Sequence, residues 1–150
     1  MSTAVLLIAH GSRHAPANLD LFESAEEIAR SGEYAIVEPA FLELAEPDIG
    51  EGGKRCVERG ATRVLMIPYF LSAGVHLLRD LTAARDDLAE RFPRATFLLG
   101  PPLGPHPLLN QLVLERVRAL DLDGPSPEFA SADEMARTYA PMGEHAEENA

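Results

Sequence analysis

Three residues that can bind a metal ion or move a proton, His10, Glu43 and His76, are evenly spaced along the chain. Each lies just past a stretch expected to be a β-strand, and 33 residues separate each from the next. This interval is about the length of one strand plus one helix. In a parallel α/β sheet the carboxyl ends of the strands lie along one edge, where ligands bind. We therefore expect two imidazoles and a carboxylate to converge, a set that suits a divalent transition metal with open coordination positions.

The apolar pattern along the chain predicts strands that alternate with helices. The expected strands cover residues 4–9, 34–42, 63–71 and 95–99, and the expected helices cover 18–30, 47–60, 75–92 and 107–120. This order predicts an α/β fold with a mainly parallel four-stranded sheet and helices on both faces. Pro47 suits the first turn of the second helix, whereas Gly50, Gly52 and Gly53 weaken that helix by about 1 kcal/mol each relative to alanine.

Length and charge predict one domain followed by a tail. Residues 1–122 of the 150 are expected to form the α/β domain, and residues 123–150 to form an acidic, flexible tail. The net charge is −11, and residues 121–150 hold eight acids and one base. A basic footprint for nucleic acid is absent from the sequence, as is an apolar run of the ~18–20 residues that span a membrane. The single cysteine, Cys56, fits a reducing cytoplasm.

Each of the three candidate residues also has an ordinary explanation. A histidine at a strand end is often a polar residue with a satisfied hydrogen bond, and a lone glutamate is usually solvated. His10 gains weight because Gly11 lets the backbone turn sharply at the functional edge. Glu43 and His76 gain weight through their shared placement with His10. Glu38 is expected in the middle of the second strand, from which its side chain could point toward the same edge.

Residues around these positions could bind a substrate. Ser72 and Gly74 predict a compact turn that can admit a large flat ligand. Arg13 and Arg79 are candidates for holding substrate carboxylates, and Ser12 lies in the same loop as Arg13. Arg79 follows His76 by three residues, which places both on one helix face. The ordinary alternative for each arginine is a solvated surface position.

Other residues near this edge have a weaker claim to a role in binding. Tyr69 and Phe70 could stack on a flat ligand or could belong to the core. Lys54 and Arg55 are further cations that could lie near the edge. His106 leaves the fourth strand and could border the site.

Several other chemistries lack their sequence motifs. No Gly-x-Gly-x-x-Gly or P-loop follows a strand. One cysteine cannot supply the paired thiolates of a zinc or iron–sulfur site. Ser12 and Ser72 are not in a Gly-x-Ser-x-Gly nucleophile elbow.

At the level of whole segments, the chain resembles the short class II chelatases of the CbiX/SirB type, which are sirohydrochlorin chelatases. The resemblance rests on LLIAHGSRHAPAN, PAFLELAEPDI, GATRVLMIPYFLSAGVHLLRDL and LLGPPLGPHPLL, which together span nearly all of residues 4–120. HGSR and PYFLSAGVH at this separation are specific as a pair. The glycine-rich start of the second helix and the acidic tail depart from the family's usual form.

The resemblance implies that residues 1–122 are a chelatase-like lobe that inserts Co²⁺ or Fe²⁺ into sirohydrochlorin, for cobalamin or siroheme biosynthesis. The family's metal-binding and catalytic positions fall on His10, Glu43 and His76. The metal would be a substrate, and no redox cofactor would be needed. Short members of the family pair as homodimers. Nickel insertion, a non-catalytic metal or tetrapyrrole carrier, and a metal-free hydrolase or transferase domain are the alternatives.

Overall fold

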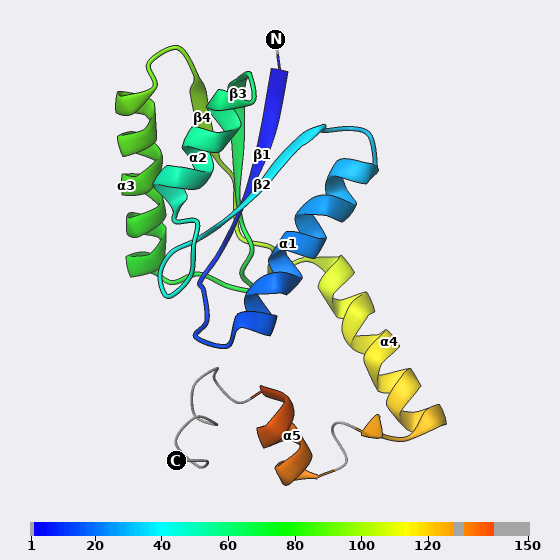
Figure 1. The fold of residues 1–150 in the computed structure, drawn as a ribbon. Helices are drawn as coiled ribbons and strands as arrows, with labels where there is room; N and C mark the ends of the chain where they lie inside the picture. The colour runs from blue at the N-terminus through cyan, green and yellow to red at the C-terminus, as the bar shows by residue number, and fades with distance from the viewer. Residues whose placement is uncertain (1, 128–130, 140–150) are drawn as a thin grey trace, which may run out of the picture. The chain divides into compact units, whose positions relative to one another are not determined.

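A parallel sheet of four strands runs through the structure in the order β2-β1-β3-β4 (Figure 1). The strands are β1 (Ser2–Ala9), β2 (Ile36–Phe41), β3 (Ala61–Pro68) and β4 (Thr96–Leu99). The structure is a computed structural model that describes residues 2–127 and 131–139. The predicted four-stranded α/β sheet is confirmed, and all its paired strands are parallel.

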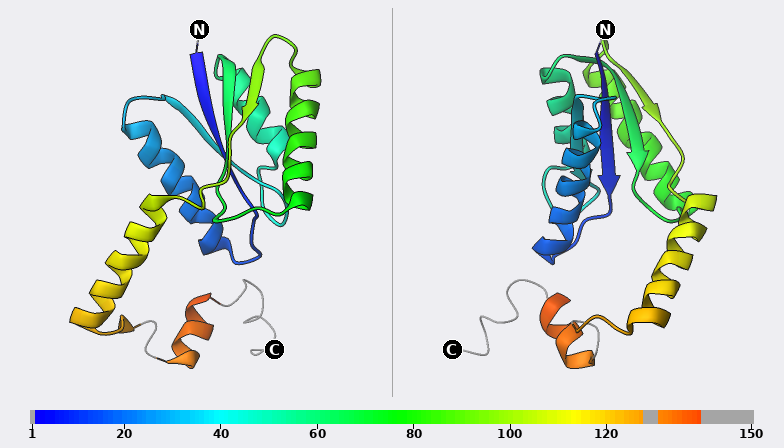
Figure 2. Two further views of the ribbon diagram at one scale, coloured as in Figure 1. Left: turned by 180° about the vertical axis from the view of Figure 1, so that it is seen from behind. Right: turned by 90° about the vertical axis from the view of Figure 1, so that its right-hand side faces the viewer.

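Helices cover both faces of the sheet, as expected (Figure 2). On one face, Leu21 and Ala25 of α1 (Ala15–Arg30) pack in a cluster with Val5 and Leu7. On the other face, α2 (Ile49–Glu58) and α3 (Val75–Arg91) pack in a cluster with the intervening residues of β1. Successive β1 side chains thus enter two different cores, which explains why that strand is apolar throughout.

The glycines of α2 allow this helix to lie close to its neighbours. Gly52 and Gly53 are both buried. A Cβ atom added to Gly52 would lie 2.8 Å from the Cβ of Ala40, and one added to Gly53 would lie 2.6 Å from a methyl carbon of Leu88. Close packing against the sheet and α3 therefore offsets the low helix propensity of glycine.

The start of α2 corrects one prediction. Pro47 was expected in the first helical turn, but it lies before the helix, which begins at Ile49. Asp48 is the N-cap residue, and its carboxylate accepts a hydrogen bond of 2.8 Å from the Glu51 N–H. The carboxylate satisfies a backbone donor that has no partner within the helix, so the helix begins after Asp48.

Most other element boundaries differ from those expected by one to three residues, and two of these differences have a clear physical basis. Helix α1 begins at Ala15 rather than Asn18, because Pro16 is compatible with the first turn of a helix. Strand β3 covers 61–68 rather than 63–71. The Tyr69 N–H nevertheless still donates to the Ile8 carbonyl oxygen at 2.7 Å, so strand-like pairing extends past the assigned end.

The chain divides into two compact units, Met1–Leu103 and Gly104–Ala150. In the second unit, α4 (Pro107–Asp123) has seven exposed large apolar residues: Leu108, Leu112, Val113, Leu114, Val117, Leu120 and Leu122. Within the expected tail, α5 (Ala132–Tyr139) is a helix that the sequence pattern did not predict. Residues 128–130 and 140–150 of that tail lie outside the described residues, and the domain boundary after residue 122 stays a prediction. None of the helices formed by the described residues is long and apolar enough to cross a membrane.

Backbone pairing continues past the carboxyl ends of β1 and β2. The Leu42 N–H donates to the Ala9 carbonyl, and the Glu43 N–H donates to the His10 carbonyl, each at 3.0 Å. Gly11 follows with φ of +99°, and a Cβ atom built there would overlap the carbonyl oxygen of Glu43. A glycine at this position is therefore needed for the segments after β1 and β2 to lie this close.

We expect Gly11→Ala to destabilise the protein more than the matched change Gly32→Ala. Both glycines have positive φ, +99° and +89°, so alanine at either costs about 1–2 kcal/mol of backbone strain. A Cβ on Gly32 would meet nothing within 4 Å, whereas at Gly11 steric overlap with Glu43 adds about 1–3 kcal/mol. Free energies of unfolding measured in urea test this difference. Equal losses in the two variants would contradict the steric argument.

Candidate functional site

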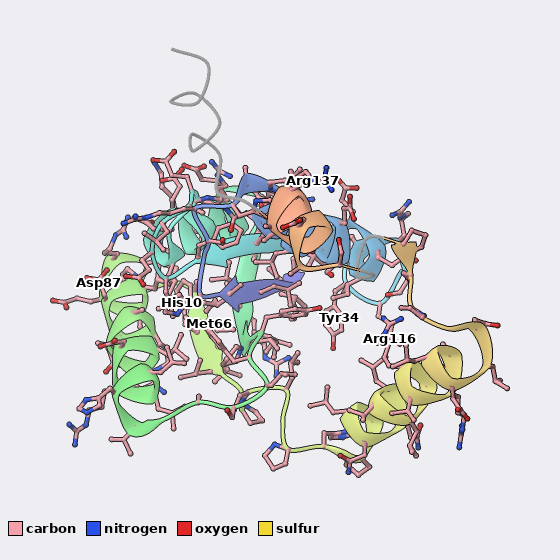
Figure 3. All side chains as sticks on the ribbon, turned by 90° about the horizontal axis from the view of Figure 1, so that it is seen from below. His10, Tyr34, Met66, Asp87, Arg116 and Arg137 are labelled. Carbon is pink, nitrogen blue, oxygen red and sulfur yellow. The ribbon has the colours of Figure 1, made fainter. Side chains whose placement is uncertain are left out.

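His10 and Glu43 form a direct contact at the carboxyl edge of the sheet. The Nε2 atom of His10 lies 2.7 Å from Oε1 of Glu43. Both side chains are open to solvent, with 60% and 58% of their side-chain surface exposed. An ion pair or hydrogen bond this exposed adds little to stability. The structure thus brings together two of the three residues singled out in the sequence, in a place that a ligand can reach. Figure 3 labels His10 in a view from below Figure 1, the side at which β1 ends.

This pair can act on a metal in two ways. A carboxylate that accepts a proton from one imidazole nitrogen orients the ring, and the other nitrogen, Nδ1 of His10, is then the metal-binding atom. Alternatively, the proton shared by His10 and Glu43 leaves and both side chains bind the same ion. In the first case Glu43 fixes which nitrogen of His10 carries the proton, and in the second case Glu43 is itself a metal ligand.

His76 lies at the same edge but in a different element. It is the second residue of α3 and is exposed. Figure 1 shows that α3 begins at the end of the sheet where β1 finishes. The strand order makes β1 and β3 neighbours whose following helices lie on opposite faces, so the segments after them flank a topological switch point, where α/β proteins bind ligands.

The three candidate ligands do not form a ready-made cluster. Among residues 2–127 and 131–139, no three histidine, cysteine, aspartate or glutamate side chains are grouped closely enough to hold an ion. The structure therefore joins His10 to Glu43 and places His76 separately at the same edge. The three-residue metal site stays a prediction.

Ser12 has a structural role in the loop after β1, and its main partner is a residue that sequence reasoning missed. The Ser12 N–H donates to Oδ1 of Asn18 at 2.9 Å, and Nδ2 of Asn18 donates to the Ser12 carbonyl at 2.7 Å. The Ser12 hydroxyl oxygen also accepts a 3.0 Å hydrogen bond from the His14 N–H. An asparagine in the first turn after a glycine-containing loop was the available signal, because such side chains often bind nearby backbone.

Arg13 and Arg79 are exposed and available to an anion. Neither forms a salt bridge with any residue in the described part of the chain. Lys54 and Arg55, the other cations considered from the sequence, each lie 3.7 Å from a glutamate one turn away in α2. The two arginines thus differ from the α2 cations in having no ion pair within the described part of the chain.

The segment after β3 is largely exposed to solvent, and its predicted role in admitting a flat ligand stays a prediction. Ser72 and Gly74 are exposed, and a Cβ added to Gly74 would meet nothing within 4 Å. Phe70 packs partly against the core, which is the ordinary alternative considered above. Tyr69 is 43% exposed and remains accessible to a ligand.

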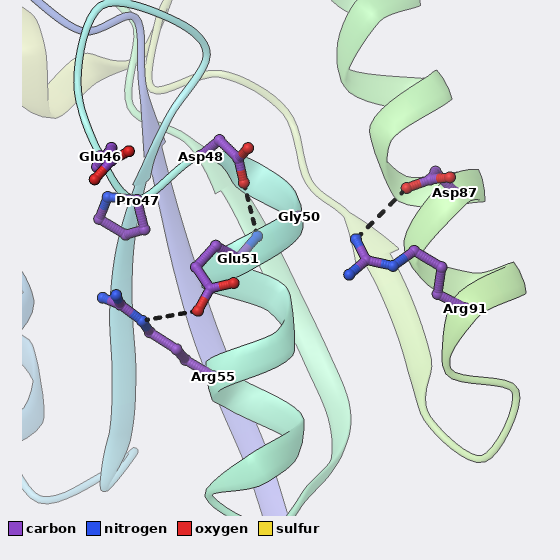
Figure 4. Close-up of a pocket in the computed structure, with 8 residues that line it drawn as sticks. All are labelled: Glu46, Pro47, Asp48, Gly50, Glu51, Arg55, Asp87 and Arg91. Carbon is purple, nitrogen blue, oxygen red and sulfur yellow. Dashed lines mark hydrogen bonds and ion pairs between the residues drawn. The ribbon is translucent and has the colours of Figure 1, made fainter.

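Several surface hollows lie beside the helices of this unit, including one on α3 and one between α2 and α3. A shallow one of about 420 Å³ begins next to His76 and is lined by Val75, Leu78, Arg79, Thr82, Ala83 and Asp86. A larger, polar one of about 650 Å³ lies between α2 and α3 (Figure 4) and is lined by Glu46, Pro47, Asp48, Gly50, Glu51, Arg55, Asp87 and Arg91. The larger hollow includes none of His10, Glu43 or His76, and its two arginines pair with acids of their own helices. The smaller hollow is not lined by these three residues either, although it begins at Val75, one residue before His76.

Three further residues are occupied elsewhere. Glu38 was expected to be able to reach the edge, but its carboxylate lies 3.0 Å from Arg59, which corrects that interpretation. Cys56 is fully buried, and burial together with the Glu38 charge raises the pKa of its thiol to about 12, so it stays protonated near neutral pH. Nδ1 of His106 accepts the Leu108 N–H at 3.1 Å and caps α4.

Comparison with known proteins places these features in a family. A sequence model of the CbiX family matches residues 4–120. A chloroplastic sirohydrochlorin ferrochelatase of Arabidopsis thaliana is 40% identical over 114 residues, which are 76% of this chain and 51% of that protein. A sirohydrochlorin cobaltochelatase of Sulfolobus acidocaldarius is 32% identical over 123 residues, which are 81% of this chain and 96% of that protein.

Solved structures agree with the sequence comparison. SirB from Bacillus subtilis with Fe³⁺ superposes with a TM-score of 0.71 at 28% identity, covering 81% of this chain and 48% of that one. A CbiX protein from Marinobacter aquaeolei gives a TM-score of 0.65 at 28% identity and is covered over 98% of its length. The chain thus spans about half the length of the Arabidopsis and Bacillus proteins and nearly all of the Marinobacter one. Since the family match extends over most of the sheet and helices described above, the chain belongs to the CbiX family.

Proposed function

We propose that this protein inserts a divalent metal, Co²⁺ or Fe²⁺, into sirohydrochlorin, in the biosynthesis of cobalamin or siroheme. The observation that carries the proposal is the exposed His10–Glu43 contact of 2.7 Å at the ligand-binding edge of a CbiX-family chain. The relatives are named both ferrochelatase and cobaltochelatase, so they do not select the metal. Imidazole and carboxylate ligands do not distinguish sharply among neighbouring divalent metals, so Ni²⁺ stays an alternative.

The reaction gives each residue of the pair a task. Insertion removes two protons from pyrrole nitrogens and transfers M²⁺ to the four nitrogens of the macrocycle, so the metal keeps its oxidation state and no redox cofactor is required. In the proposed mechanism the neutral imidazoles of His10 and His76 hold the ion. Because the protein supplies few ligands, coordination positions on the ion stay open for the macrocycle. Glu43, in contact with His10, either completes the ligand set or receives the released protons.

Residues of the loop after β1 and of the start of α3 suit a flat, polycarboxylate tetrapyrrole. Exposed Val75 and Leu78 supply apolar surface next to Arg79 in the shallow hollow at the start of α3. Arg13 supplies a second cation in the loop after His10. We propose that both arginines bind substrate carboxylates. In this proposal Ser12 shapes the loop after β1, and Ser72 and Gly74 leave the segment after β3 open to the substrate.

We expect His10→Ala and Glu43→Gln each to reduce kcat/KM for metal insertion by about 100-fold or more, since they remove a ligand or a proton acceptor. The measurement is the absorbance change of sirohydrochlorin under anaerobic conditions with Co²⁺, Fe²⁺ and Ni²⁺ in parallel. Glu90→Gln, an exposed glutamate of α3, is the matched control and should keep the wild-type rate. Near-normal turnover by His10→Ala would rule out the assigned role. A folded wild-type chain that accelerates insertion of none of the three metals would favour the carrier alternative.

Removing Arg13 or Arg79 should weaken substrate binding more than it slows the chemical step. We expect Arg13→Ala and Arg79→Ala each to raise the KM for sirohydrochlorin about 3–10-fold with little change in kcat. The effect should shrink as salt is added, because the contacts are exposed and electrostatic. Arg94→Ala, which removes an exposed arginine between α3 and β4, is the control. An equal rise in KM for the control would show that only net charge matters.

We also propose that the chain pairs as a homodimer. It covers 51% of the Arabidopsis relative, so two copies would supply the length of one such protein. The exposed apolar residues of α4 are surface that a partner could cover. Sedimentation equilibrium should then give about twice the chain mass of 16.3 kDa, and a single-chain mass at micromolar concentrations would contradict pairing. A cytoplasmic location and the absence of nucleic-acid partners stay predictions.

A further inference from the structure

The loop that carries His10 depends on a side chain from the following helix. Residues 10–14 connect β1 to α1 without helix or strand structure, so their backbone polar groups need other partners. Asn18 supplies two of them at one residue, because its carboxamide accepts the Ser12 N–H at 2.9 Å and donates to the Ser12 carbonyl at 2.7 Å. The carboxamide thus bonds to both backbone groups of Ser12, as the backbone of a neighbouring strand would.

Asn18 is itself held on a well-packed element. It lies in the first turn of α1, and Leu21, one turn further along the helix, is 3% exposed in the core cluster on that face of the sheet. Ala25, one more turn along, is also 3% exposed. The Asn18 side chain therefore connects the loop to a helix that the sheet core fixes in place.

The position of the clamp matters because of the residue between Ser12 and His10. Gly11 has φ of +99° and no side chain of its own to restrain it. On the far side of Gly11, the His10 carbonyl accepts the Glu43 N–H at 3.0 Å. The backbone bond between Glu43 and His10 and the Asn18 clamp on Ser12 thus lie on the two sides of Gly11. Without Asn18, only the first of them would restrain the backbone around Gly11.

We propose that Asn18 is a positioning residue for the metal-binding edge: its carboxamide fixes the Ser12 backbone and, through Gly11, holds His10 in its orientation toward Glu43. The inference rests on the proposed function in one respect, the role of His10 in binding the metal. Asn18 touches neither metal nor tetrapyrrole in this scheme. By restraining the loop, Asn18 limits the conformations that His10 adopts before the ion binds, so less conformational entropy is lost on binding.

The test measures Co²⁺ binding to the 150-residue chain in the absence of the tetrapyrrole, followed by the visible absorption of the bound Co²⁺. We expect Asn18→Ala to weaken Co²⁺ binding about 10–100-fold, the range found when groups that orient metal ligands are removed. In insertion assays kcat should fall while the KM for sirohydrochlorin changes little. Amide hydrogen exchange at Ser12 should become faster, because its N–H loses its acceptor.

Two variants separate positioning from a general loss of structure. Asn18→Asp keeps the shape and the acceptor of the side chain but cannot donate to the Ser12 carbonyl, so it should not restore Co²⁺ affinity. Glu26→Ala removes an exposed side chain of α1 and should match wild type in affinity, turnover and exchange. Full Co²⁺ affinity in Asn18→Asp would overturn the two-bond clamp.

The outcomes distinguish this inference from the proposed function. A wild-type chain that binds Co²⁺ but does not insert it contradicts the chelatase assignment, and the affinity of the Asn18 variants still tests positioning. Unchanged Co²⁺ affinity and turnover in Asn18→Ala, together with faster Ser12 exchange, overturn positioning and leave Asn18 a loop anchor alone. If Asn18→Ala is unfolded, Asn18→Asp supplies the same comparison with a side chain of the same size.

Discussion

The parallel pairing of the central strand β1 with β2 on one side and β3 on the other determines where the residues of the candidate site lie. In this register Ala9 is opposite Phe41 and Ile8 is opposite Pro68. The next residues along each chain therefore leave the sheet side by side, which brings His10 to Glu43. The register is specified by the two cores, because a slip of one residue would turn every β1 side chain to the opposite face. The site geometry is thus a consequence of packing far from the site.

The structure also depends on close approach of backbone segments, which glycines permit both in the core and in the loops after the strands. Gly52 and Gly53 let α2 lie against the sheet and α3, where a Cβ atom would collide with buried carbon atoms. Gly11 lets the segments after β1 and β2 run together beyond the strands. Helix propensity alone predicts that the α2 glycines weaken this helix. Propensity describes an isolated helix, however, whereas the stability of α2 comes from the sheet and the helix against which it packs.

The alternation of strands and helices was readable from the sequence because apolar periodicity records which faces are buried. The His10–Glu43 contact followed from that order, since parallel strands end at one edge. The Asn18 clamp, the Asp48 cap and the Glu38–Arg59 pair did not follow, because each depends on the path of a loop or the end of a helix. Such local side-chain contacts are set by backbone conformations that residue periodicity does not record. His76 was placed at the correct edge, but its distance from His10 depends on the segment between β3 and α3.

In the proposed function the metal is a substrate, and a substrate metal places a different demand on a site than a metal that stabilises a fold. Structural zinc sites surround the ion with four protein ligands and close it off from water. An ion that must enter, meet a macrocycle and leave with it needs ligands that are accessible and positions that stay open. The His10–Glu43 pair is more than half exposed and adds little to stability. Burial does not maintain the orientation of this pair, so neighbouring hydrogen bonds must do so. The backbone hydrogen bond from the Glu43 N–H to the His10 carbonyl lies on one side of Gly11, and the Asn18 clamp on Ser12 lies on the other.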